Sequence, residues 1–155
     1  MRLRQLFAML ACTLASCRES TSPDLASLVG EWAAASEVSR FDGSSYEVSL
    51  SLREDHTYVR NWRYYDASTS LRAYVTTEGT FSLRADSIFM RPVTDRSWDR
   101  DFNGGAVTVT PVSSSGVYGQ SGARFEVSSE TLVLHFLTYP ADAPVETSES
   151  LARLH

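Results

Sequence analysis

Hydrophobic and polar residues alternate along most of this chain with a period of two, the pattern of β-strands that bury one face. The longest such stretch is 71–84, where apolar and polar side chains separate cleanly by parity. Residues 46–53 alternate in the same way, and 57–65 are predicted to return as the next strand after a polar turn. A helix would instead repeat apolar residues three and four apart. The pattern therefore predicts an antiparallel β protein.

The remaining strands are shorter and are bounded by turn residues. A bend or bulge is expected near Gly79, where a missing side chain permits it. Pro92 is expected to end a strand over 87–91 because proline lacks a backbone donor, and 94–105 then reads as a polar loop. Further strands are predicted at 28–32, 107–111, 123–127, 132–137 and 147–154.

A loose internal repeat supports this assignment. Phe81-x-Leu83-x-x-Asp86-x-Ile88 and Phe125-x-Val127-x-x-Glu130-x-Leu132 share one spacing, and Leu50-x-Leu52-x-x-Asp55 begins in the same way. Each reads as a hairpin with an acidic residue at its turn. A sheet of such hairpins buries its edges by closing on itself. We therefore expect an all-β, antiparallel, up-and-down barrel of eight to nine strands over residues 25–155.

The N-terminal segment has the features of an export signal. A basic start at 1–5 precedes an apolar run at 6–15 that is too short to span a bilayer as a helix. Leu14-Ala15-Ser16-Cys17 follows and resembles the lipobox of bacterial lipoproteins. That resemblance implies removal of residues 1–16 and acylation of Cys17. The alternative is an ordinary signal peptide that leaves Cys17 as a free thiol.

The resemblance to lipoproteins also predicts a location. Residues 17–24 are rich in Ser, Thr and Pro, which suits a flexible tether between an anchor and a domain. The acyl chains of such a cysteine would hold the protein on a membrane of the bacterial cell envelope. Arg18 follows the cysteine, and in related sorting systems that would direct the lipoprotein to the outer membrane.

Charge and cysteine content narrow the function further. The chain has 14 basic and 19 acidic residues, and Arg2 and Arg4 lie in the predicted signal. This acidic excess argues against nucleic acid or an anionic surface as a partner. Cys12 also lies in the signal, so acylation of Cys17 leaves no thiol for a disulfide. Stability must then come from strand pairing and core packing.

Two short motifs resemble those of a known family. Leu28-x-Gly30-x-Trp32 at the start of the chain's β region, and the later Gly79-x-Phe81-x-Leu83, are similar to sequences in lipocalins and bacterial lipocalin-like lipoproteins. The resemblance implies that Trp32 closes one end of the barrel and that an arginine from a late strand packs across its ring. Arg153 is the candidate for that arginine, with Arg124 second.

Lipocalin-like barrels bind a small apolar ligand when part of the interior is left empty. The aromatic residues predicted to face inward either line such a pocket or fill it, and a filled or very small cavity is the preferred interpretation. Arg60 shares their parity and would need an anionic partner if buried. That partner could be a ligand carboxylate, whereas an internal glutamate or a surface position is the favoured alternative. The inward aromatic residues are Tyr58, Trp62, Tyr64, Phe81 and Phe125.

Other site chemistry is weakly indicated. Asp99, Asp101 and Asn103 match the opening half of a calcium-binding loop, but Thr110 stands where a closing glutamate is needed. An acidic hairpin loop is the preferred interpretation, with no metal. No Gly-x-Ser-x-Gly motif is present, and we expect neither an enzyme nor a cofactor. The histidines are too scattered to suggest a metal site: His56, His135 and His155.

The leading hypothesis is a monomeric, membrane-anchored envelope lipoprotein that binds a small apolar or amphipathic molecule. The alternative is a barrel with a filled core that engages or inhibits an envelope protein. In that case the loops at 65–70 and 95–105 would form the contact surface.

Overall fold

The computed structural model describes residues 24–35, 38–112, 122–139 and 143–155. The predicted signal over 1–16, the predicted acylation site Cys17 and the predicted tether up to residue 23 lie outside the described residues. Within the described part of the chain, no helix has the length and apolar character needed to cross a bilayer.

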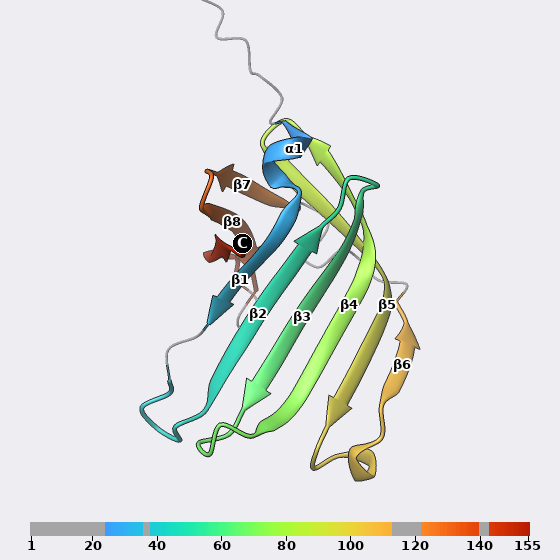
Figure 1. Ribbon diagram of the computed structural model, residues 1–155, viewed down its shortest axis with the longest axis vertical. Coiled ribbons are helices and arrows are strands. Elements are labelled where there is room, and N and C mark those ends of the chain that lie inside the picture. The colour runs from blue at the N-terminus through green and yellow to red at the C-terminus, as the bar shows by residue number, and fades with distance from the viewer. Residues whose placement is uncertain (1–23, 36–37, 113–121, 140–142) are drawn as a thin grey trace, which may run out of the picture.

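Within the described residues, nine antiparallel strands form the molecule (Figure 1). Eight of them close into a barrel in the order β1-β2-β3-β4-β5-β7-β8-β9, and β9 pairs with β1. The ninth strand, β6, pairs with residues 94–97 of β5. The all-β, up-and-down barrel expected from the alternation is therefore confirmed. The strands are β1 Gly30–Ala35, β2 Ser45–Leu52, β3 Thr57–Tyr65, β4 Leu71–Arg84, β5 Ser87–Asp99, β6 Thr108–Pro111, β7 Ala123–Val127, β8 Thr131–Thr138 and β9 Val145–Arg153.

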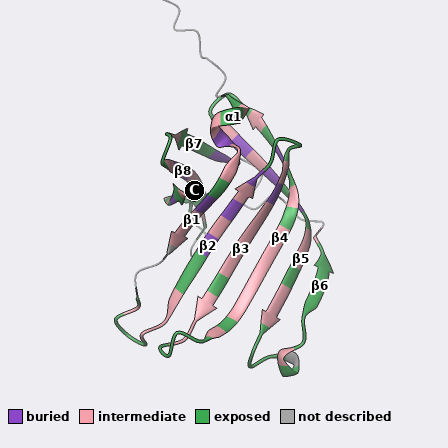
Figure 2. Cartoon of the chain, in the orientation of Figure 1, coloured by how far each residue is buried: buried purple, intermediate pink, exposed green. Residues whose placement is uncertain are grey.

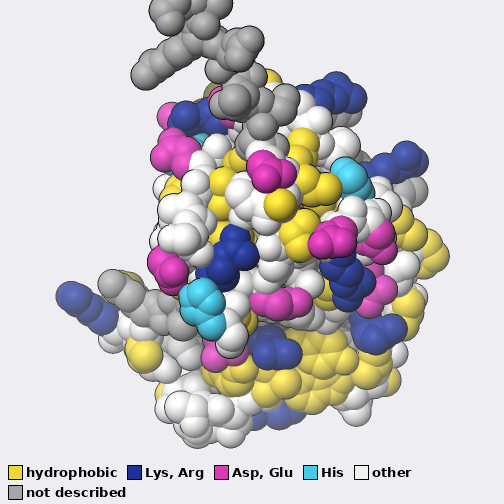
Figure 3. Space-filling model, turned by 45° about the horizontal axis from the view of Figure 1, so that its top comes forward, with side chains coloured by type: hydrophobic (Ala, Val, Ile, Leu, Met, Phe, Trp, Pro, Cys, Tyr) yellow, Lys and Arg dark blue, Asp and Glu magenta, His cyan; other side chains and the backbone are white. Residues whose placement is uncertain are grey.

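The two ends of the barrel differ in their connections. One end, called here the closed end, carries helix α1 (Leu25–Leu28) and the turns β2–β3, β4–β5 and β7–β8. These turns are the three hairpins of the sequence repeat, and they share one end because successive strands alternate in direction. At this end, the Asp24 carboxylate accepts a hydrogen bond from the Ala26 N–H and caps α1. Figure 3 is turned so that the closed end comes forward, and it shows charged side chains of both signs with apolar side chains between them.

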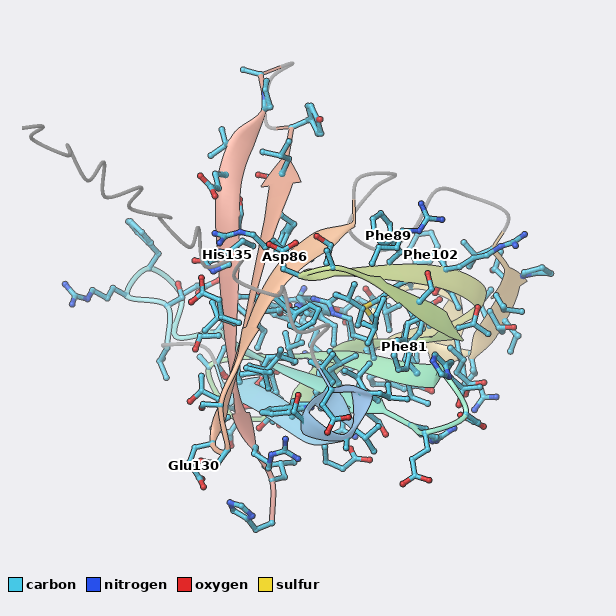
Figure 4. The ribbon with its side chains drawn as sticks, turned by 90° about the horizontal axis from the view of Figure 1, so that it is seen from above. Phe81, Asp86, Phe89, Phe102, Glu130 and His135 are labelled. Atoms are coloured by element: carbon cyan, nitrogen blue, oxygen red, sulfur yellow. The ribbon has the colours of Figure 1, made fainter. Side chains whose placement is uncertain are left out.

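The opposite end, called here the open end, carries the turn β3–β4 and the longer connections β1–β2, β5–β6 and β8–β9. The connection β5–β6 contains the short helix η1 (Asn103–Gly105). Seen from above, β8 and β9 form a long hairpin that projects at one side of the molecule (Figure 4).

The pairing of β4 with β5 contains a bulge. Gly79 pairs with Pro92, whereas the preceding Glu78 pairs with Thr94, so Val93 is an extra residue on β5. A side chain at Gly79 would collide with the Arg91 carbonyl oxygen and the Tyr58 ring. The bend expected near Gly79 is thus confirmed, and its cause is the close approach of β5.

The prediction that Pro92 ends its strand is wrong. Proline cannot donate to a ladder, but at the bulge the ladder is already interrupted, so β5 continues to Asp99. The polar loop expected over 94–105 therefore begins only after Asp99. The extra residue also exchanges the two faces of β5, which brings Asp95, Ser97 and Asp99 opposite the inward positions of β4.

The fully buried core lies toward the closed end, where Figure 2 shows the buried positions of the strands gathered. Phe81 lies among the side chains enclosed by the strands in Figure 4. Among the described residues, no polar or charged residue is fully buried in this core. Its members are Leu28, Trp32, Val48, Leu50, Leu52, Tyr58, Phe81, Ile88, Met90, Ala123, Phe125, Leu132, Leu134 and Leu151.

Candidate functional site: the open half of the barrel

The closed half of the lumen, next to α1, ends at a tryptophan with an arginine over it. Trp32 has no exposed surface, and its indole N–H donates to the Leu28 carbonyl at 2.9 Å. The Arg153 guanidinium lies 4.1 Å from the centre of the Trp32 ring, which is cation–π geometry. The same guanidinium donates to the backbone carbonyls of Val29, Ser27 and Ser129.

Gly30 makes room for this arrangement. Its φ is +147°, a value that favours glycine, and a Cβ there would lie 2.7 Å from Arg153 Nη1. Arg153 thus occupies the position proposed for it from the family resemblance. Arg124, the second candidate, lies instead on β7 and pairs with Glu126 at 3.5 Å.

Three of the predicted ligand residues belong to the packed closed half. Tyr58, Phe81 and Phe125 point inward, but each is buried in the core. They therefore fill the barrel at this level, and none of the three lines the hollow at the open end that is described below.

The open half of the lumen is aromatic but only partly covered. Trp62 stacks on Tyr64, with ring centres 5.9 Å apart, and on Tyr46 of β2, with ring centres 6.3 Å apart. Tyr46 shares the inward parity of Val48 and Leu50, yet 47% of it is exposed. An inward side chain that still meets solvent shows that the barrel opens at this end.

A hollow of about 420 Å³ lies against these strands at the open end. Its size falls in the range of about 300–1,000 Å³ that is usual for small-molecule sites. Trp62, Val75 and Ser97 contribute one cross-strand row of its wall, and Ala73 with Asp99 contributes the next row outward. The other lining residues are Tyr74, Trp98, Phe102, Ala106 and Thr108.

Arg60 lies one row inward from this hollow, and its partner is internal. Its Nη2 is 3.1 Å from Glu149 Oε1, and the two side chains are 24% and 17% exposed. Glu149 comes from β9, which β2 and β1 separate from β3 in the sheet. The pair therefore bridges the lumen. This is the internal glutamate that the sequence left as an alternative to a ligand carboxylate.

Two inward residues beside Arg60 are not predicted as site residues from the sequence. Thr77 pairs with Arg60, and Asp95 pairs with Thr77, so the three form one row across β3, β4 and β5. Asp95 is not predicted to lie on a strand, because the proline at position 92 indicates a strand end. The alternation of Asp95, Ser97 and Asp99 after that proline is the signal that indicates a continuing strand.

The electrostatics of this row act on Tyr58. Burial raises the pKa of the Tyr58 hydroxyl well above its ordinary value, and the negative charge of Asp95 raises it further, while Arg60 opposes them. Among the described residues, neither this hydroxyl nor the buried Asp95 Oδ1 has a hydrogen-bond partner.

Carboxylates in the loops of the open end are committed to local structure. Hydrogen bonds from Ser39 and Ser44 lower the pKa of Asp42 to about 2. In the β3–β4 turn, the Ser68 hydroxyl is the main cause that lowers the pKa of Asp66 to about 2, and Arg100 also pairs with it at 3.0 Å. Both groups are ionised at neutral pH and act as turn acceptors, not as proton-transfer groups.

Two of the candidate calcium residues, Asp99 and Asp101, also serve as acceptors at the open end. Asp99 accepts a hydrogen bond from the Asp101 N–H at 2.8 Å, and Asp101 pairs with Arg72 at 2.9 Å. Across the described segments, no three His, Cys, Asp or Glu side chains group as metal ligands would. The histidines lie apart: His56 packs against Phe81, His135 faces Glu126, and His155 faces Glu130.

No family model and no curated protein sequence matches this chain. The geometry of the barrel is therefore the basis for the function proposed below.

Proposed function

We propose that this protein binds a small amphipathic molecule in the open half of its barrel. The observation that carries the proposal is the contrast within one lumen: side chains fill the closed half, while the open half has a hollow of about 420 Å³. A small-molecule site combines apolar and aromatic walls with a few polar groups. The stacked Trp62 and the Arg60–Glu149 pair one row inward provide both.

The body of the ligand would pack on the aromatic wall. Trp62 offers a flat surface, and Val75 with Ala73 extends it along β4. Phe102, on the β5–β6 connection, borders the same hollow and is 68% exposed. Covering these side chains would remove apolar surface from water, which contributes about 25 cal/mol for each Å².

The proposed setting is the bacterial cell envelope, with the protein anchored through an acylated Cys17 and lying at the outer membrane. The basic start, the apolar run and the lipobox-like Leu14-Ala15-Ser16-Cys17 support this. The fold suits such an anchor because α1, where the described chain begins, sits at the closed end. A tether entering there leaves the open end free to receive a ligand.

The ligand proposal is tested by native mass spectrometry of the full-length Cys17→Ser chain, which cannot be acylated. We expect a co-purified small molecule bound one to one, and its loss in a Trp62→Ala variant. Phe41→Ala is the matched control, because Phe41 is a fully exposed loop aromatic outside the hollow. Absence of any co-purified molecule, together with no binding of added amphiphiles, would overturn the proposal.

The anchor is tested separately by detergent phase partitioning. The wild-type chain should enter the detergent phase, and Cys17→Ser should remain in the aqueous phase. Equal partitioning of the two would refute acylation of Cys17.

A second candidate function, docking of an envelope protein, rests on the rim of the open end. Large apolar side chains project from three of its connections: Phe41 from β1–β2, Phe102 from β5–β6 and Tyr139 from β8–β9. Aromatic side chains such as these are enriched at protein–protein interfaces. A Phe41→Asp/Tyr139→Asp variant should lose the partner in cross-linking experiments while it keeps the ligand of the Trp62 site.

A further inference from the structure

One row inward from the residues that line the hollow, the lumen carries more acid than base. Asp95 faces Arg60 across Thr77 on the barrel wall, and Glu149 reaches Arg60 from the opposite side. This level of the lumen therefore holds two carboxylates and one guanidinium. Because Arg60 is paired with Glu149 at 3.1 Å, the negative charge of Asp95 is the excess charge of this row.

Two oxygen atoms in or next to this row have no hydrogen-bond partner within the described chain. One is Asp95 Oδ1 and the other is the Tyr58 hydroxyl oxygen, and both atoms are buried. Tyr58 is only 1% exposed and lies in the next row toward the closed end. Buried polar groups are normally hydrogen-bonded, so such groups beside a hollow indicate what a ligand would supply.

We propose that the inner end of the hollow binds the protonated amine head group of an amphipathic ligand, with Asp95 as its charged acceptor and Tyr58 as a second polar contact. This inference rests on the proposed function and specifies the class of ligand. The head group would lie inward, against Asp95 and Thr77, and the apolar part would extend outward along Trp62 and Val75.

The charge balance explains why an amine fits better than a carboxylate. An anionic head would meet Asp95 and Glu149 while Arg60 is already paired, and like charges at close range repel. An ammonium group would instead compensate the excess charge and donate hydrogen bonds, which are strong when both partners are charged. The pKa of Tyr58 agrees with this sign, since the effect of Asp95 on it outweighs that of Arg60.

The test compares three ligands of equal chain length by isothermal titration calorimetry: octylamine, octanoate and octanol. The protein is the full-length Cys17→Ser chain at neutral pH, where the amine is protonated and the acid is ionised. We expect octylamine to bind at least about tenfold more tightly than octanoate, with octanol between them.

Two variants then locate the selectivity. Asp95→Asn should weaken octylamine binding about tenfold or more and leave octanol binding nearly unchanged. Asp86→Asn is the matched control, since it removes an equal charge from the β4–β5 turn at the closed end. It should leave all three affinities unchanged. Circular dichroism of both variants confirms that they remain folded.

The possible failures are distinct. Equal affinities for octylamine and octanoate, or an Asp95→Asn variant that weakens octanol as much as octylamine, would overturn the amine assignment while ligand binding itself stands. An equal effect of Asp86→Asn would assign the preference to overall charge and would also overturn it. No binding of any of the three ligands would overturn the proposed function as well.

Discussion

The two halves of the barrel share one strand pattern and differ in what it encloses. In both, alternate residues of the same strands point inward. In the closed half these are Trp32, Leu50, Leu52 and Phe81, which pack until almost no surface is left. In the open half they are Trp62, Ala73, Val75 and Asp95, a mixture of aromatic, small and charged side chains. The alternation therefore decides which side chains face the lumen, and their size and charge decide whether the lumen fills.

This division separates stability from recognition. Apolar burial drives folding, and the fully buried apolar side chains lie toward the closed end. The lumen of the open half contains a charge pair and half-covered aromatics, which contribute less to stability and offer contacts to a ligand. Substitutions that are chemically alike should therefore act differently in the two halves.

The largest expected contrast is between two tryptophans. Trp32→Ala should lower the free energy of unfolding by about 3–5 kcal/mol, because it removes a fully buried ring and leaves a cavity. Trp62→Ala should cost about 1 kcal/mol or less, since its ring is only partly covered. Urea denaturation measures both. A larger loss from Trp62→Ala would contradict the assignment of the two halves.

The next largest effect on stability is expected at the Arg60–Glu149 pair, which bridges the lumen. Glu149→Gln should destabilise the protein by about 2–3 kcal/mol, because it leaves the charge of Arg60 with a poorer partner in a site that is less than one-quarter exposed. The double variant Arg60→Met/Glu149→Leu should cost less than the single one, since apolar residues of similar volume replace both charges. Thermal unfolding of the three chains tests this. A double variant that loses at least as much stability as Glu149→Gln would show that the charge of Arg60 without its partner is not the cause of the loss.

The strand pattern and the closed end could be predicted from the sequence because they depend on local signals. Strict alternation places β4, and the return of the chain after a polar turn places β3; both strands have the predicted bounds. The Gly30-x-Trp32 spacing puts the tryptophan inward, and the resemblance to lipocalins suggested Arg153 as its partner. In these cases a neighbour along the strand or a short motif carries the information.

The inner row of the open half could not be predicted, because it depends on contacts between distant strands. Arg60 and Glu149 are 89 residues apart in sequence, and no local pattern connects them. Asp95 faces inward only because the bulge at Val93 exchanges the faces of β5. Pro92 gave the opposite indication, since a proline usually ends a strand.

A smaller effect on stability is expected at Gly30, which lies against the Arg153 guanidinium. Gly30→Ala should cost about 2 kcal/mol, because its φ of +147° strains an alanine and the new Cβ would displace the Arg153 guanidinium. Gly104→Ala is the matched control, since its φ is also positive but no atom lies within 4 Å of the new Cβ. It should cost about 1 kcal/mol. Equal losses in urea denaturation would mean that the contact with Arg153 contributes nothing.

The smallest effect on stability is expected at Tyr58, whose hydroxyl lies next to the row that contains Asp95. Tyr58→Phe should stabilise the protein by about 1 kcal/mol at neutral pH, because it removes a buried hydroxyl that has no partner in the described chain. The difference should then grow at alkaline pH. Unfolded tyrosine loses its proton near pH 10, whereas the raised pKa keeps Tyr58 protonated in the folded state. The unfolded chain then binds fewer protons, so wild-type stability falls as pH rises through this range.

Urea denaturation at neutral pH and at several pH values around 10 measures this difference. Tyr139→Phe is the control, because it removes an exposed loop hydroxyl. If Tyr58→Phe is less stable than the wild type at neutral pH, the Tyr58 hydroxyl already makes a stabilising contact and is not available as a hydrogen-bonding group for a ligand. If instead the two chains lose stability in parallel as pH rises, the buried hydroxyl ionises as readily as in the unfolded chain. The field of Asp95 in the lumen would then be too weak to select a cation.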